Sequence, residues 1–294
     1  AFQPQQSGSA ASLRGLWAVD GRVAWATGAG GTVLRTVDGG IHWESLRIPD
    51  AAHLDFRDVH AESGSLAYVL SAGPGPLSRL YKTSDGGKTW TVSDNGLPQT
   101  KFTGRIGLHF SRSNPNVVYA SVDNHSPKRD PKPGELDPYG RPIQVIPFGL
   151  QVWRSDDKGN NWRKVSTEDD KLERFAGTYG WVFGQIRVDP SDENTIYVMG
   201  LGLNQSKDAG RTFQPLRGMH GDHHALWIDP ENPNYLVNGN DGGVVISYDQ
   251  GRTWRQYLDN LPAVQFFNVS YDMDEPFHVF GSIQDHGSRR GVVD

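Results

Sequence analysis

The amino-acid sequence predicts an all-β fold made of repeated four-stranded units, and three observations support this prediction. An acidic motif recurs five times along the 294 residues. The chain holds 35 glycines and 18 prolines, which favour turns, and 31 aromatic residues (nine Trp, ten Tyr, twelve Phe), which favour strands. Short alternations of apolar and polar residues flank each copy of the motif. No stretch is apolar over the length that a membrane-spanning helix needs, so we expect no membrane insertion.

The motif is Ser or Thr, then Asp two residues later, Gly two residues after the Asp, and an aromatic residue three positions further on. We call its five copies the acidic turns: 36–43, 83–90, 155–162, 206–213 and 247–254. Their aspartates are separated by 47, 72, 51 and 41 residues, and they are Asp38, Asp85, Asp157, Asp208 and Asp249. The long interval contains a Pro-rich insertion, 125–149, and without these 25 residues it also becomes 47.

Each residue type in the motif suits a tight turn between two strands. The Asp side chain can accept hydrogen bonds from backbone N–H groups of its own turn. The Gly can adopt a positive φ, and the aromatic ring can be buried between packed sheets. We therefore interpret the five aspartates as structural residues and not as catalytic ones.

Around each acidic turn, alternation and turn residues predict four short strands. The predicted units are 12–48, 54–94, 103–166, 182–216 and 224–258, followed by an incomplete sixth, 266–294. Four-stranded units repeated around a ring predict a single β-propeller domain, residues 1–294, with six blades. Asp294 lies 45 residues after Asp249, where a sixth acidic turn would begin. The N-terminal residues 1–7 could supply the missing outer strand and remove a free sheet edge. The alternative is a fragment of a larger, open propeller.

The acidic turns resemble the Asp-box, or BNR, repeat of sialidases, xyloglucanase-type glycosidases, sortilin-type receptors and photosystem II assembly-factor-type propellers. Residues 13–90, with RGLWAVDGRVAWATGAGGTVLRTVDGG, look like the assembly-factor type. Residues 103–290, with HGDHHALWIDPENPN and QFFNVSYDMDEPFHVFGSIQDHGS, look like bacterial sortilin-type "glycosyl hydrolase" propellers. The chain could therefore be a natural or engineered hybrid. The resemblance implies the fold and leaves the function open, because such relatives differ in activity.

Sialidase chemistry does not carry over from this resemblance. The Arg-Ile-Pro tripeptide of that family precedes its first Asp-box, whereas LRIP (46–49) follows the first acidic turn here. No Tyr–Glu pair can be assigned.

The face of the propeller opposite the acidic turns, which we call the mouth face, is where we expect a site. It carries the loops that lead into each innermost strand, and six of the ten histidines are expected on those loops. Imidazole and carboxylate groups at short spacing can bind a divalent metal such as Zn²⁺ or Ca²⁺. The predicted metal ligands are His125, His220, His223, His224 and His286. The predicted catalytic residues, through a metal-bound hydroxide or a His–Asp base, are Asp222, His223, His224, Asp241 and Asp285. The same histidines could instead only support the loops.

Further polar and aromatic residues fall near the starts of the innermost strands. The predicted substrate-binding residues are Arg57, Arg105, Tyr179, Trp181, Gln265 and Gln284. The Pro-rich insertion resists regular structure and is predicted to form a loop, either a lid over the mouth face or a solvated segment.

These features leave three functional hypotheses. The first is a hydrolase acting on a glycan or an ester at the mouth of the channel. The second is a non-catalytic propeller that binds a peptide or glycan, and the third is a hybrid scaffold without evolved activity. The net charge of −5 argues against a nucleic-acid partner. The absence of cysteine excludes disulfides and thiolate metal sites. We expect a secreted or periplasmic bacterial protein whose N-terminus lacks an intact signal peptide.

Overall fold

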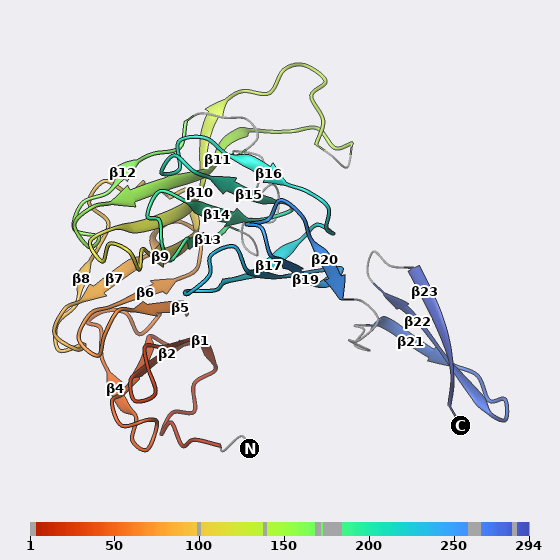
Figure 1. Cartoon of the computed structure of the whole chain (residues 1–294), viewed down its shortest axis with the longest axis horizontal. Helices are drawn as coiled ribbons and strands as arrows, with labels where there is room; N and C mark the ends of the chain where they lie inside the picture. The colour runs from red at the N-terminus through yellow and green to blue at the C-terminus, as the bar shows by residue number, and fades with distance from the viewer. Residues whose placement is uncertain are drawn as a thin grey trace. The chain divides into compact units, whose positions relative to one another are not determined.

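The computed structural model describes residues 4–98, 101–137, 140–167, 172, 184–257, 266–283 and 287–293. The chain divides into two compact units, Ala1–Arg255 (unit one) and Gln256–Asp294 (unit two). Unit one holds five four-stranded antiparallel sheets, and unit two holds a three-stranded sheet (Figure 1). These sheets confirm the all-β prediction and are those of a six-bladed β-propeller. That both units form one domain remains a prediction.

The strands of unit one follow one another across each sheet in chain order. The first sheet contains β1 (Leu13–Ala18), β2 (Ala24–Gly28), β3 (Thr32–Thr36) and β4 (Glu44–Leu46). The second contains β5 (Phe56–Ala61), β6 (Ala67–Ser71), β7 (Leu80–Thr83) and β8 (Thr91–Val92), with a turn of 3-10 helix at Gly75–Leu77. The third contains β9 (Thr103–Phe110), β10 (Val118–Arg129), β11 (Ile146–Ser155) and β12 (Arg163–Lys164). The fourth contains β13 (Gln185–Val188), β14 (Ile196–Met199), β15 (Leu203–Ser206) and β16 (Gln214–Leu216). The fifth contains β17 (His223–Ile228), β18 (Leu236–Asn240), β19 (Gly243–Ser247) and β20 (Arg255–Tyr257).

The sheet of unit two consists of β21 (Phe266–Tyr271), β22 (Phe277–Ile283) and β23 (Gly287–Val293). The fourth strand that we expected from residues 1–7 is not among the strands paired in the described part of the chain. Gln5 instead bonds to the first acidic turn: its side-chain amide donates to Gly39 O at 3.2 Å, and its Oε1 accepts from Trp43 Nε1 at 3.3 Å. Closure of the ring by the N-terminus therefore remains a prediction.

The acidic turns share a single hydrogen-bond pattern. In the second turn, Thr83 Oγ1 donates to Asp85 Oδ1 at 2.9 Å and accepts the Gly87 N–H at 2.8 Å. Asp85 also accepts the backbone N–H of Thr89 at 2.9 Å and its hydroxyl at 2.6 Å. The same four bonds recur in the other turns, where the residue replacing Thr89 is His42, Asn161, Thr212 or Thr253. Each carboxylate thus binds its own turn, as the sequence predicts.

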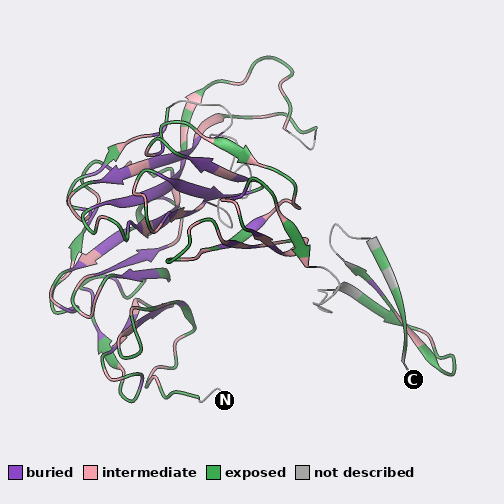
Figure 2. Ribbon diagram, in the orientation of Figure 1, coloured by how far each residue is buried: buried purple, intermediate pink, exposed green. Residues whose placement is uncertain are grey.

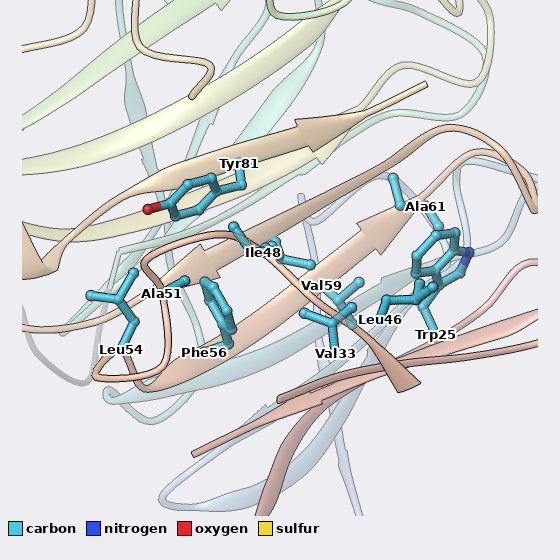
Figure 3. Close-up of a cluster of buried hydrophobic side chains, with 12 residues drawn as sticks. Trp25, Val33, Leu46, Ile48, Ala51, Leu54, Phe56, Val59, Ala61 and Tyr81 are labelled. Atoms are coloured by element: carbon cyan, nitrogen blue, oxygen red, sulfur yellow. The ribbon is translucent and has the colours of Figure 1, made fainter. Parts of the chain in front are cut away.

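The apolar core lies between successive sheets. Trp25, Phe56 and Tyr81 belong to the cluster between the first and second sheets (Figure 3). Three similar clusters join the second to the third, the third to the fourth, and the fourth to the fifth sheet. Buried residues accordingly follow the strands of unit one, whereas unit two is largely exposed (Figure 2). Apolar burial of this kind is the main stabilising contribution to a fold.

The Pro-rich insertion is partly strand, which differs from the loop that its composition predicts. β10 and β11 remain paired as far as Arg129 and Ile146, and the hairpin projects from the third sheet (Figure 1). Arg129 then binds Glu135 through two bonds of 2.8 and 2.9 Å, and Arg141 binds Asp137 at 2.7 Å. Proline is tolerated here because the register shifts around Pro127, where the ladder is irregular. Whether the hairpin acts as a lid remains a prediction.

Within the described ranges, no helix combines the length and the apolar character needed to cross a membrane.

Candidate functional site at the mouth of the channel

In a propeller, the first strand of each sheet lies beside the central axis. Polar side chains of that strand that point toward the axis therefore line the central channel. In unit one, β1 contacts β5, β9 contacts β13, and β13 contacts β17. Most of the residues discussed below therefore come from the starts and middles of these five innermost strands.

Asp58, Arg105 and Arg187 form an electrostatically coupled group on three innermost strands. Asp58 reaches solvent, but crowding by the protein raises the pKa of its carboxyl, against the opposing effects of the Val59 N–H, Arg187 and Arg105. Desolvation likewise lowers the pKa of both arginines, and Asp58 partly offsets it. The two hydrogen bonds of Arg187 found in the described part of the chain go to neutral oxygens, Ile186 O and Gln185 Oε1. One carboxylate thus faces two guanidinium groups.

A second cluster of the same kind lies at the start of β5. Asp55 accepts a 2.8 Å bond from Arg14 Nε and a 2.6 Å bond from Arg57 Nε. The positive charge of Arg57 also acts on Arg105, which connects this cluster to the channel group. Four arginines and the carboxylates of Asp55 and Asp58 therefore lie along the mouth and wall of the channel. Arg57 and Arg105 were predicted from the sequence as ligand-binding residues, and the structure brings them together.

A pocket of about 370 Å³ opens beside this cluster, between residues 72–75, residues 101–105 and the edge of β10. Its polar wall is Asp123 and His125, on one face of β10. His125 Nε2 lies 2.9 Å from Asp123 Oδ2, with the imidazole half exposed and the carboxylate 5% exposed. Asp123 Oδ2 has no well-directed hydrogen bond within the described residues, so its contact with the imidazole is mainly electrostatic. The Asp123 carboxylate raises the pKa of His125, against the effect of burial.

The lack of a side chain at Gly104 lets the His125 ring lie close to the backbone of β9. A Cβ on Gly104 would lie 2.8 Å from His125 Nε2, which is shorter than any ordinary contact. His125 itself lies within β10, not on a loop as we expected, because the pairing of β10 with β11 continues into the Pro-rich insertion as far as Arg129 and Ile146.

The segment 220–224, where the sequence places most of its candidate ligands, does not bring its histidines together. His223 is buried, and its Nδ1 lies 2.8 Å from Asn238 Oδ1. His224 points to solvent, with its Nε2 3.1 Å from Asp241 Oδ1. His220 Nδ1 lies 3.1 Å from Gly221 O.

His223 and His224 belong to β17, which corrects their expected placement on a loop. Adjacent residues of a strand face opposite sides, so the two rings are separated by the pleat of the sheet. Burial lowers the pKa of His223, opposed by its bond to Asn238. Asp222 adopts a positive φ of 58° at the turn before the strand. Their catalytic and metal-binding roles remain predictions.

The other predicted site residues lie outside the described residues. They are Tyr179, Trp181, Gln265, Gln284, Asp285 and His286.

In the described part of the chain, a different trio of side chains has metal-like spacing: Asp272, Asp274 and His278, at the turn between β21 and β22. His278 Nδ1 lies 2.8 Å from Asp272 Oδ2, and the Arg290 guanidinium donates to His278 Nε2. A ring nitrogen that accepts from Arg290 leaves the proton on Nδ1, where it is donated to Asp272. Because Nδ1 then offers no lone pair to a metal, we interpret the trio as a hydrogen-bonded turn.

The sequence reasoning missed Asp58 and Arg187. Both are charged residues at interior positions of innermost strands, FRDVHA and QIRV. A charge at an interior position of such a strand is a signal, because it costs free energy unless the side chain faces a wet channel or a partner.

No protein-family model matches the sequence. Vacuolar protein sorting/targeting protein 10 from Colletotrichum graminicola is 33% identical over 91 residues, which is 30% of this chain and 6% of that protein. Photosystem II assembly lipoprotein Ycf48 from Synechococcus sp. (strain CC9902) is 23% identical over 267 residues, which is 88% of this chain and 66% of that protein. The chain thus spans less than two thirds of each curated relative.

Two solved structures share the fold. Ycf48 from Cyanidioschyzon merolae aligns with a TM-score of 0.51 at 16% identity, covering 95% of this chain and 82% of its own. An ancestral GH74 enzyme aligns with a TM-score of 0.57 at 12% identity, covering 95% of this chain and 40% of its own. At these identities the likeness shows the fold, a β-propeller, and leaves the chemistry of the site to its residues.

Proposed function

We propose that this chain is a binding propeller whose channel mouth recognises an acidic segment of a protein partner. The observation that carries the proposal is the concentration of Arg14, Arg57, Arg105 and Arg187 around Asp55 and Asp58. A guanidinium group binds carboxylates with two parallel hydrogen bonds, and such charge-assisted bonds are strong when partly desolvated.

The surroundings of the cluster favour an extended peptide over a small ion. Arg14 and Arg57 lie at the mouth. The neighbouring pocket, lined by His125 and Lys101, continues the polar surface beyond them. A chain with several carboxylates could bridge these positions, and each added contact would contribute to affinity. The Synechococcus relative is named as an assembly lipoprotein, which also supports a partner-binding role.

Binding of a fluorescein-labelled peptide of about ten glutamates, followed by fluorescence polarisation, tests this proposal. Arg105→Gln combined with Arg187→Gln should weaken binding at least about tenfold, since charge-assisted hydrogen bonds contribute about 1.5–3 kcal/mol each. Arg163→Gln is the matched control, because Arg163 lies on the outermost strand β12 and pairs with Asp156. Equal affinity in the double variant and in the control would overturn the proposal, as would equal binding of an oligolysine peptide.

A second candidate function is metal-free hydrolysis of an ester or glycoside by His125. The specific observation is the buried Asp123 carboxylate, which can orient the imidazole and stabilise its charged form. His125 would take a proton from a water molecule, which would attack the acyl or anomeric carbon, and the imidazolium would return the proton to the leaving oxygen.

Turnover of p-nitrophenyl acetate and p-nitrophenyl glycosides tests the hydrolase hypothesis. His125→Ala should reduce turnover to the rate that free imidazole gives. His53 is an exposed histidine before β5, and His53→Ala should leave turnover unchanged. Unchanged rates in His125→Ala would exclude this base. The hybrid scaffold hypothesis predicts neither turnover nor peptide binding.

The metal-dependent version of the hydrolase rests on His125, His220, His223, His224 and His286, which would hold Zn²⁺ or Ca²⁺. Elemental analysis of the purified protein before and after chelation tests it. A metal content well below about one ion per chain would exclude it. We also propose a location outside the cytoplasm, in keeping with the lipoprotein name of the Synechococcus relative.

A further inference from the structure

A separate cavity of about 320 Å³ opens between the first three sheets on the face that carries the acidic turns. Its walls are the ends of β1, β5 and β9 and the turns that follow them. The lining includes Trp17, His60, His109, Phe110, Glu62 and Arg112. None of these residues belongs to the arginine cluster or to the His125 pocket.

Aromatic and imidazole rings form one wall of this cavity. The Trp17 and His60 ring centres lie 3.8 Å apart, and His60 stacks on Phe110 at 4.5 Å. His109 meets His60 edge-on at 5.2 Å. Stacked flat rings of this kind favour another flat ring, since offset and edge contacts between aromatic groups are attractive.

The imidazoles supply hydrogen-bonding groups without charge. His60 is 7% exposed, and its ring makes no hydrogen bond within the described residues. His109 Nδ1 accepts the Val188 N–H at 3.2 Å, so the ring proton is on Nε2. Burial, reinforced by the charges of Arg187 and Arg112, lowers the pKa of both rings, that of His109 to about 3. A ring nitrogen without a protein partner can donate to or accept from a ligand in the cavity.

The rim of the cavity carries one cation without a carboxylate partner in the described part of the chain, Arg112. The acidic rim residue, Glu62, faces Lys158 Nζ at 3.7 Å. A negatively charged ligand group at the rim would therefore meet Arg112, while the charge of Glu62 is partly balanced.

We propose that this cavity binds a small planar aromatic carboxylate, with its ring against Trp17 and His60 and its acidic group at Arg112. The ring surface explains a flat apolar body, the neutral imidazoles accommodate polar ring atoms, and the rim selects a negative charge. The site is independent of the peptide-binding mouth, so either proposal can fail alone.

Indole N–H resonances of ¹⁵N-labelled protein test the proposal, because the chain has nine tryptophans and Trp17→Phe identifies one of them. Benzoate should shift the Trp17 resonance saturably and leave the other eight in place. Benzamide, which has the same shape without the charge, should bind about fivefold more weakly, as should cyclohexanecarboxylate, which has the charge without the flat ring.

Two arginine variants locate the charge recognition. Arg112→Gln should weaken benzoate binding about fivefold and bring it to the level of benzamide. Arg22→Gln, an exposed arginine in the β1–β2 turn on the same face, should bind benzoate as the unmodified protein does. The unmoved indole resonances report that each variant is folded. No shift of Trp17 with benzoate, equal binding of benzamide, or an unchanged affinity in Arg112→Gln would overturn the proposal.

Discussion

The acidic turns and the innermost strands both recur five times in unit one, but only the turns repeat their chemistry. All five turns make the same four hydrogen bonds. Just after each innermost strand, one backbone N–H bonds to the carbonyl that immediately precedes the second strand. The residue two positions before this N–H is an equivalent position in all five sheets. It is occupied by Trp17, His60, His109, Arg187 and Trp227. What is constant between repeats therefore builds the sheet, and what varies at the axis is available for binding.

The largest test of this difference is a pair of tryptophan truncations. Trp162, of the third acidic turn, is 6% exposed within an inter-sheet cluster, whereas Trp227, of β17, is 50% exposed. Trp162→Ala should lower the free energy of unfolding by about 3–5 kcal/mol, because it leaves a cavity. Trp227→Ala should cost under about 1 kcal/mol. Urea unfolding followed by circular dichroism measures both, and equal costs would contradict the comparison.

A smaller effect is expected from the hydroxyl of an acidic turn. Ser155 is buried and accepts the Gly159 N–H at 2.8 Å, so Ser155→Ala leaves that N–H without a partner. We expect a loss of about 1–3 kcal/mol in the free energy of unfolding. Ser155→Thr is the control, since Thr36 and Thr83 occupy this position in the first two turns. A destabilisation by Thr as large as that by Ala would show that the hydroxyl is not the cause.

The turns also predict how stability changes in acid. Hydrogen bonds from the residue four positions on lower the pKa of Asp38, Asp85 and Asp249 to about 2. Because the unfolded value is near 3.9, this contribution is complete above about pH 4 and is lost as the pH falls toward 2. The urea midpoint should therefore decline between about pH 4 and pH 2. Asp249→Asn should start from a lower midpoint and decline less steeply, and a flat profile for the unmodified protein would contradict the argument.

The smallest effect concerns the residue after each turn aspartate. Gly39 has φ 78° there, but Ala209 holds φ 60° in the fourth turn. A side chain in this conformation is strained, so Ala209→Gly should stabilise the protein by about 0.5–1 kcal/mol. The reciprocal Gly39→Ala should destabilise it. Thermal unfolding measures both shifts, and shifts of the same sign would refute the assignment to backbone strain.

The sequence predicted the turns correctly because their hydrogen bonds are local, within five residues of Asp85 or its equivalents. It could not predict which side chains line the axis. Register shifts between Phe56 and Asp58, and between His223 and Ala225, interrupt the alternation of β5 and β17. Each such bulge moves the following residues to the other face of the strand. This is why Arg57 and Asp58 are both exposed and Asp58 was missed.

Several bonds between sheets run in one direction along the chain. The Trp25 indole donates to Ser63 O in the second sheet, the Tyr68 hydroxyl to Lys158 O in the third, and the Tyr119 hydroxyl to Glu193 O in the fourth. In each case the earlier sheet holds the donor side chain and the later one offers a main-chain carbonyl. For these three bonds, a polypeptide emerging from the ribosome would meet the donor on the part already made.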